Sequence, residues 1–191
     1  MMVEKMGQEM AQQNVFLVLS CLGPDRPGLV AEVTDYLTTR GGNVEDSRMA
    51  ILGAEFGILL LASAKAEQAD AIERDIATLE NTTGLGVLAR RTKSPEEHRR
   101  APTIPCLVTA EALDHEGIVR AVSRGLAMAG VNIVSLESSS YAAPVTGSPL
   151  FRMEARVDVP QNVGVGRVRK AMDAVAEEQN LEIEVRSLVK M

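Results

Sequence analysis

The sequence has little of what several protein classes need. Its 191 residues include no Trp, 3% aromatic residues, two His and two Cys. Platforms that bind single-stranded nucleic acids depend on stacking aromatic side chains, so that class is disfavoured. Two cysteines, Cys21 and Cys106, are too few for a disulfide framework, and we expect both thiols to be buried and inert.

Basic charge and long apolar runs are also missing. The formal net charge is -6, and no basic stripe marks a surface for duplex nucleic acid. No apolar run approaches the roughly 18 residues of a membrane span. Residues 1–13 hold four Met and two Glu, without the apolar core of a secretory signal, so we expect a flexible tail. These features favour a reducing, cytoplasmic setting.

The chain contains an internal repeat. When it is shifted by 89 residues, 25–43 lies on 114–132 without a gap, and seven of these nineteen positions are identical. A later apolar ladder in 69–79 matches 165–175 at an offset of 96, which indicates an insertion, with 138–149 the richest candidate. The identical pairs are Asp25/Asp114, Gly28/Gly117, Val30/Val119, Val33/Val122, Leu37/Leu126, Gly41/Gly130 and Asn43/Asn132.

Both copies predict the same order of elements. The fold class we expect is α+β, with two ferredoxin-like βαββαβ domains, each an antiparallel four-stranded sheet with two helices on one face. The nearly continuous apolar run 14–21 predicts a strand buried on both faces. The limits expected are 1–13 for the tail, 14–92 for the first domain, 93–103 for a linker with two Pro, and 104–191 for the second.

Individual elements follow from periodicity and turn residues. Each expected helix has apolar side chains at helical spacing, and each expected strand is an apolar or alternating run. In the first copy, strands are expected at 14–21, 43–52, 56–64 and 85–92, with helices from Leu29 to Gly41 and at 67–80. In the second copy, strands are expected at 104–110, 131–138, 150–159 and 181–188, with helices at 118–129 and 163–179.

The turn before the first helix has the chemistry of an anion site. Asp25 is a candidate helix cap, Pro27 suits a first turn, and Gly28 lets a ligand approach the backbone closely. Free N–H groups and the helix dipole favour a carboxylate, to which Arg26 adds positive charge. Asn43, which begins the next strand, offers both donor and acceptor. The alternative is a tight capped turn that binds nothing.

These residues carry a resemblance to a known family. The first copy resembles the ACT domain, the small-molecule-sensing regulatory module of amino-acid metabolism. The tandem pair resembles the glycine cleavage system transcriptional repressor family, and 143–151 is similar to the extra loop that this family places before its third strand. The matching residues of the first copy are Gly23-Pro24-Asp25-Arg26-Pro27-Gly28-Leu29-Val30, Leu37, Gly41 and Asn43-Val44.

The resemblance implies a non-enzymatic regulatory protein without a cofactor or metal. ACT-like units would pair and hold a small amino acid at their interface, glycine being the first candidate. A partner protein, in that family a DNA-binding activator, would sense the bound state, and the chain could form a homodimer. The ligand-binding residues implied are Gly23, Pro24, Asp25, Arg26, Pro27, Gly28, Leu29, Asn43 and Val44, with Asp114, His115, Glu116, Gly117, Ile118, Asn132 and Ile133 in the second copy.

Two other functions stay open. In the second copy His115-Glu116 replace Arg26-Pro27, and the acidic side chain would repel a ligand carboxylate, so the copies need not bind alike. Asp114 joins this pair to group three metal-ligating types, which keeps a hydrolase or metal-dependent enzyme as one alternative. The other alternative is a ligand-free interaction module whose repeats only extend a sheet.

Overall fold

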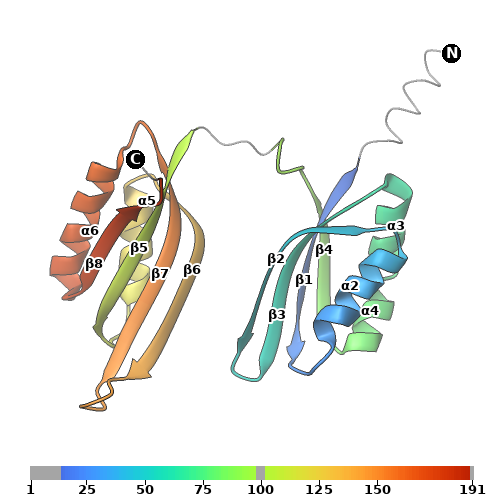
Figure 1. The fold of residues 1–191 in the computed structure, drawn as a ribbon, viewed down its shortest axis with the longest axis horizontal. Coiled ribbons are helices and arrows are strands. Elements are labelled where there is room, and N and C mark those ends of the chain that lie inside the picture. The colour runs from blue at the N-terminus through green and yellow to red at the C-terminus, as the bar shows by residue number, and fades with distance from the viewer. Residues whose placement is uncertain (1–13, 98–101, 190–191) are drawn as a thin grey trace. The chain divides into compact units, whose positions relative to one another are not determined.

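The computed structural model describes residues 14–97 and 102–189. The chain forms two compact units, one on either side of this gap. Each unit is an antiparallel four-stranded sheet with helices on one face (Figure 1), which confirms the α+β plan of two βαββαβ domains. The expected tail and His98 lie outside the described residues. The domain limits given above, including the linker 93–103, stay predictions.

The sheet of the first domain has the strand order β2-β3-β1-β4, and all neighbours are antiparallel. The left-handed Gly41, with φ of 76°, follows the first helix and donates its N–H to the Thr38 carbonyl, which ends the helix. The elements are β1 (Val15–Pro24), α2 (Leu29–Thr39), β2 (Asn43–Leu52), β3 (Glu55–Ala64), α3 (Ala66–Arg74), α4 (Ile76–Thr83) and β4 (Gly86–Thr92).

Strand β1 is buried on one face only within its domain. Leu17, Leu19 and Cys21 point into the core beneath the helices, whereas Val18 is half-buried and Leu22 is 60% exposed. The expectation of burial on both faces is therefore wrong for this unit. The reason is topological, because right-handed crossovers place every helix of the unit on the same side of the sheet.

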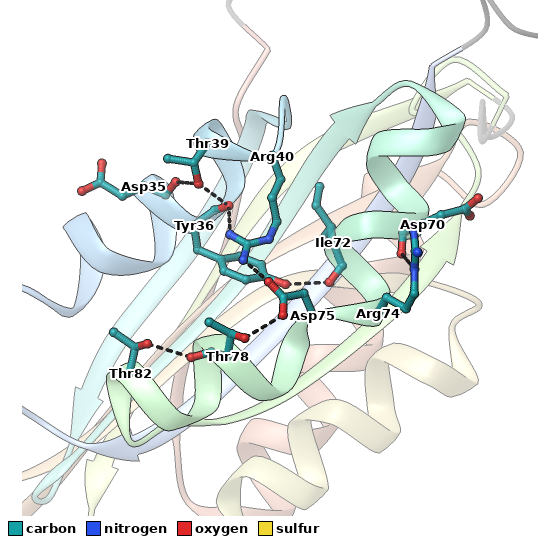
Figure 2. Close-up of polar contacts among 10 residues, drawn as sticks. All are labelled: Asp35, Tyr36, Thr39, Arg40, Asp70, Ile72, Arg74, Asp75, Thr78 and Thr82. Carbon is teal, nitrogen blue, oxygen red and sulfur yellow. Dashed lines mark hydrogen bonds and ion pairs between the residues drawn. The ribbon is translucent and has the colours of Figure 1, made fainter.

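The expected helix at 67–80 is two helices, because α3 ends at Arg74 and α4 begins at Ile76. At the break, the Asp75 N–H donates to the Ala71 carbonyl at 3.2 Å and the Tyr36 hydroxyl donates to the Ile72 carbonyl at 2.6 Å. Figure 2 shows this junction, where a side chain of α2 reaches the carbonyl that the break would otherwise leave without a partner.

The second domain repeats the plan with the strand order β6-β7-β5-β8. Half of the insertion expected at 138–149 is strand, because β6 and β7 pair from Ser138↔Met153 to Ala142↔Pro149. The insertion lengthens a hairpin, whose remaining turn covers 143–148. The elements are β5 (Thr103–Leu113), α5 (Ile118–Met128), β6 (Asn132–Ala142), β7 (Pro149–Pro160), α6 (Val165–Gln179) and β8 (Glu182–Ser187).

The two cysteines are free and buried, one in each core. Burial raises the pKa of the Cys21 thiol to about 11 and raises the pKa of Cys106 above its ordinary value. The thiolate is the reactive form of cysteine, so both side chains act as apolar core residues, as the sequence predicts.

Candidate functional site

The turn between β1 and α2 is built around a left-handed glycine. Gly28 has φ of 95° and precedes the first helical residue, Leu29, so that the first N–H groups of α2 have no intrahelical acceptor. No side chain caps this helix, and the expected cap by Asp25 is wrong. The Asp25 N–H instead donates to the Ala54 carbonyl at 2.9 Å, which ties the turn to the β2–β3 hairpin.

Arg26 is held by the protein itself. Its guanidinium makes two contacts of 2.6 Å with the Glu32 carboxylate and donates to the Thr83 carbonyl at 3.3 Å, at the end of α4. The Arg26 pair keeps the pKa of Glu32 below its usual range, chiefly through these hydrogen bonds. A carboxylate therefore already lies at the start of α2, and a ligand carboxylate would have to compete with it.

Asn43 lies at the start of β2, an edge strand of the sheet. Its amide donates to Glu45 Oε1 at 3.0 Å, and the Ser63 hydroxyl donates to the same oxygen at 2.5 Å. The Ser63 and Asn43 hydrogen bonds keep the pKa of Glu45 below its usual range. The side chain of Asn43 is exposed, and its amide oxygen faces no protein donor within the described residues.

Gly28 and Asn43 lie at opposite ends of α2, which has 11 residues. A helix of that length spans about 16 Å, more than the reach of a small amino acid. One domain therefore does not bring its two groups of candidate residues together. A ligand that touched both kinds of residue would need a second ACT-type unit.

The other candidate residues of the first domain divide between core and surface. Leu29 is 2% exposed and packs in the core, so its side chain is not available to a ligand. Gly23 is also buried, and a Cβ atom there would lie 3.0 Å from the Gly84 carbonyl oxygen. Pro24, Pro27 and Val44 are exposed. The accessible features of this region are the turn backbone and the β2 edge.

The turn before α5 keeps the glycine but changes its neighbours. Gly117 has φ of 94° and again precedes the helix without a side-chain cap. The ring nitrogens of His115 lie 3.1 Å from the carbonyl oxygens of Glu116 and Gln179, the second of which ends α6. Asp114 turns away and accepts a hydrogen bond of 2.7 Å from Ser140.

These contacts separate the three side chains that the enzyme hypothesis needs together. His115 packs on two carbonyls, Asp114 binds Ser140, and the Glu116 side chain is exposed. Among residues 14–97 and 102–189 there is no group of three His, Cys, Asp or Glu that could hold a metal ion. The geometry therefore gives the metal-dependent alternative no support.

The remaining candidates of the second copy are split in the same way. Ile118 is 2% exposed and Ile133 is partly buried, and both pack with the core. Asn132 is exposed and its amide donates to the Ile133 carbonyl at 3.1 Å, a bond different from that of Asn43. The two copies therefore differ in the side-chain hydrogen bonds of Asn43 and Asn132.

A hollow of about 460 Å³ runs along α5, from Glu116 to Met128, between that helix and α6. Arg120 and Arg124 border it together with Glu116 and Glu178, and neither arginine has a hydrogen-bond or ion-pair partner in the described part of the chain. Sequence reasoning did not single out these arginines, although their spacing of four residues places them on one helix face.

In the part of the chain that the structure describes, no helix is long and apolar enough to cross a membrane.

Comparison with known proteins agrees with this architecture. A family model described as "ACT domain" matches residues 15–89. The glycine cleavage system transcriptional repressor of Escherichia coli is 25% identical over 169 residues, which cover 87% of each chain. The crystal structure of an unknown protein from Galdieria sulphuraria is 35% identical, with a TM-score of 0.79, and the match covers 93% of this chain and 100% of that one.

An enzyme is also among the similar proteins. The phosphoserine phosphatase SerB2 of Mycobacterium tuberculosis is 28% identical over 175 residues, or 90% of this chain. The chain spans only 41% of that enzyme's length. The likeness therefore concerns a part of the phosphatase, whereas the bacterial repressor is matched along most of its length.

Proposed function

Because the chain belongs to the ACT domain family and resembles the glycine cleavage system transcriptional repressor over most of its length, we propose that it is a regulatory protein that binds a small amino acid. Glycine is the first candidate ligand. The bound state controls a partner protein in the transcriptional regulation of amino-acid metabolism. We place this role in the cytoplasm. The net charge of -6 supports control through a protein partner rather than through direct contact with DNA.

The observation that carries this proposal is the pair of left-handed glycines at the helix starts. Gly28 and Gly117 have φ values of 95° and 94°, although the two residues before each glycine differ in type. A side chain is strained in this conformation, so both turns depend on glycine and leave backbone N–H groups open to a ligand. These groups and the helix dipole suit the carboxylate of an amino acid.

The distance between Gly28 and Asn43 supports a site shared between ACT units. The turn of one unit would bind the ligand carboxylate, and the exposed amide of Asn43 on another unit's edge strand would bind the ammonium group. Such a site forms only when units associate, so the ligand would favour association by the free energy of its own binding. This link between ligand and assembly is what a partner protein would sense.

The Arg26–Glu32 pair favours a second candidate function for the first domain. Because Glu32 already satisfies the guanidinium, the turn of the first domain has an internal anion where the proposal places the ligand. In a ligand-free interaction module, this pair would only fix the turn and join α2 to the end of α4. The regulatory protein would bind an amino acid in its folded state, whereas the ligand-free interaction module would bind none.

A thermal-shift screen of the whole chain against the twenty amino acids tests the proposal, with calorimetry on any ligand found. A ligand at 100 times its dissociation constant adds about 2.7 kcal/mol of stability, which is readily detected. Asn43→Ala should weaken binding of that ligand, because it removes an exposed amide without touching the core. Asn162→Ala, at an exposed turn after β7, is the matched control and should bind normally.

Two results would count against the proposal. If a well-folded chain is stabilised by none of the amino acids, the ligand-free interaction module becomes the better account. If an amino acid binds equally well to Asn43→Ala and to the control, a ligand exists but its site is elsewhere.

A further inference from the structure

The sheet of the first domain has one face that no helix of that domain covers. We call it the outer face, and its centre is apolar, with Leu22, Leu59 and Leu88 exposed by 60%, 53% and 62%. It also carries a hollow of about 300 Å³ bordered by Val18, Leu59 and Leu61. The outward positions are Val18, Ser20 and Leu22 on β1, Gly57, Leu59 and Leu61 on β3, Asp46, Arg48 and Ala50 on β2, and Gly86, Leu88 and Arg90 on β4.

The same face of the second domain is charged. Its central strands carry Arg152, which pairs with Glu111 at 3.4 Å and with Glu154 at 2.7 Å. Its other charged outward positions are Glu137, Arg156, Asp158, Glu182, Glu184 and Arg186. An apolar outer face is therefore not a requirement of the fold. A cluster of exposed leucines on one domain only is typical of an interaction surface.

The registers of the strands place the outward side chains in rows across the sheet, because directly opposed residues of antiparallel strands share a face. Each row crosses the strands in the order β2, β3, β1 and β4. The three rows are Asp46-Leu61-Val18-Arg90, Arg48-Leu59-Ser20-Leu88 and Ala50-Gly57-Leu22-Gly86.

The first row is self-complementary in charge. It has an acid at one edge, a base at the other and two apolar side chains between them. A two-fold axis parallel to the strands, midway between β3 and β1, exchanges β2 with β4 and β3 with β1. This operation sets Asp46 of one copy against Arg90 of the other, twice in each dimer. Arg90 has no hydrogen bond or ion pair within the described residues, and Asp46 has only exposed contacts, with Arg48 and with the Ser47 N–H at 2.8 Å.

The other rows are complementary in size under the same operation. Leu22 lies against Gly57, which has no side chain, and Leu59 lies against the small Ser20. Leu88 lies against Arg48, whose aliphatic stem can cover an apolar group. On the central strands β3 and β1 of these two rows, large side chains therefore face small ones, as interdigitation of two aligned sheets about 10 Å apart requires.

We propose that two copies of this chain associate face to face through the outer faces of their first domains, about this two-fold axis. Strands β1, β2 and β3 have ten residues each and β4 has seven, so together they cover roughly 600 Å² before side-chain relief is added. That is near the ~800 Å² that one partner contributes to a standard interface. The surface is separate from the glycine turns, so this association does not depend on the proposed ligand.

Sedimentation velocity of the full-length chain tests the proposal. Concentrations from about 1 μM to about 100 μM cover dissociation constants in the micromolar range. The wild-type chain should form dimers. Leu59→Glu should weaken dimerisation at least about tenfold, because it buries a charge at the centre of the interface. Leu113→Glu is the matched control, since Leu113 is 62% exposed on the outer face of the second domain, and it should dimerise as the wild type does.

A charge exchange tests the two-fold axis itself. Asp46→Arg and Arg90→Asp should each weaken the dimer several-fold, because each sets like charges against one another. The double variant restores the opposed pair and should restore the dimer, an outcome that a general loss of stability would not give. Circular dichroism checks that each variant is folded.

The proposal fails on any of three results. A wild-type chain that stays monomeric at about 100 μM would show that something else covers the outer face, or nothing does. A dimer that Leu59→Glu leaves unchanged uses another surface. Single charge variants that weaken the dimer, without recovery in the double variant, would rule out this axis.

Discussion

The first domain has Tyr36 where the second domain, in the repeat alignment, has Gly125. Tyr36 is 6% exposed, lies beneath the Arg40 guanidinium at 3.9 Å from the ring centre, and donates to the Ile72 carbonyl (Figure 2). Arg40 in turn binds Asp75, which accepts from Thr78 at 2.6 Å. This group of side chains surrounds the break between α3 and α4.

In the second domain the helices pack closely where α5 has no side chain, at Gly125. A Cβ atom on Gly125 would lie 2.7 Å from Met172 Cε and 2.9 Å from Val175 Cγ2, so the absent side chain is what admits these two residues. Helix α6 is continuous from Val165 to Gln179. The comparison teaches that a large residue on the first helix needs a hydrogen-bonded break in the second helix, whereas a glycine permits close packing on an unbroken one.

The largest expected effect comes from removing Tyr36. Tyr36→Ala should lower the free energy of unfolding by about 3–5 kcal/mol, because it leaves a cavity between α2 and the broken helix. Tyr36→Phe keeps the ring and should cost about 1–3 kcal/mol, because the Ile72 carbonyl loses its donor. Urea denaturation followed by circular dichroism measures both. Tyr141→Phe, at a residue 42% exposed, is the control and should change stability by less than about 0.5 kcal/mol.

A smaller effect is expected where the second domain relies on glycine. Gly125→Ala should destabilise the chain by about 1–2 kcal/mol, since overpacking against Val175 outweighs the better helix propensity of Ala. Gly166→Ala is a control of opposite sign, because nothing lies within 4 Å of a Cβ there, and it should stabilise α6 by up to about 1 kcal/mol. Equal effects at the two positions would contradict the close-packing account.

The Glu32 side chain offers a sharper test of the glycine turn. If an amino acid binds the turn of the first domain, Glu32→Gln should raise its affinity by up to about tenfold, because Arg26 loses its competing internal carboxylate. Calorimetry measures the change. Glu67→Gln, at an exposed position of α3, is the control and should bind as the wild type does. If the affinity of Glu32→Gln for the amino acid is unchanged or lower, Arg26 does not bind the carboxylate of the ligand.

The smallest expected effect is on the response to acid. The pKa of Glu32 lies below its ordinary 4.5 in the folded chain, because Arg26 binds the ionised form. Its stabilisation is therefore fully present above pH 4.5 and is lost as the pH falls through the lower folded value. Glu32→Gln should flatten the fall in denaturation midpoint below pH 4.5. A fall as steep as that of the wild type would assign the acid response to other carboxylates.

Much of this fold could be predicted from the sequence. The repeat and the apolar periodicity gave the order of strands and helices, because both signals are local. The break at Asp75 could not be predicted in this way, since the tyrosine that bonds the carbonyl at the break lies on another helix. The extension of β6 from Ser138 to Ala142 was missed because Ser138-Ser139-Ser140 has a loop-like composition, and only pairing with β7 makes it a strand.

The candidate site was predictable in its residue types and not in its contacts. The sequence places Gly28 directly before the first helix, but its left-handed conformation, with φ of 95°, was not predicted. The pairing of Arg26 with Glu32 was not foreseen, although the two residues are six apart in sequence. The arginines at 120 and 124 were also missed, because the hollow beside them forms only where α5 packs on α6.

The sequence by itself determined that this is a tandem α+β protein with glycine turns at two equivalent helix starts, because periodicity and backbone conformation are properties of short segments. The tertiary structure decided which of those segments have partners. It gave Arg26 an internal anion, separated Gly28 from Asn43 by the length of a helix, and left the leucines of one sheet face exposed. These outcomes depend on which residues distant in sequence are brought together, and a local pattern carries no information about that.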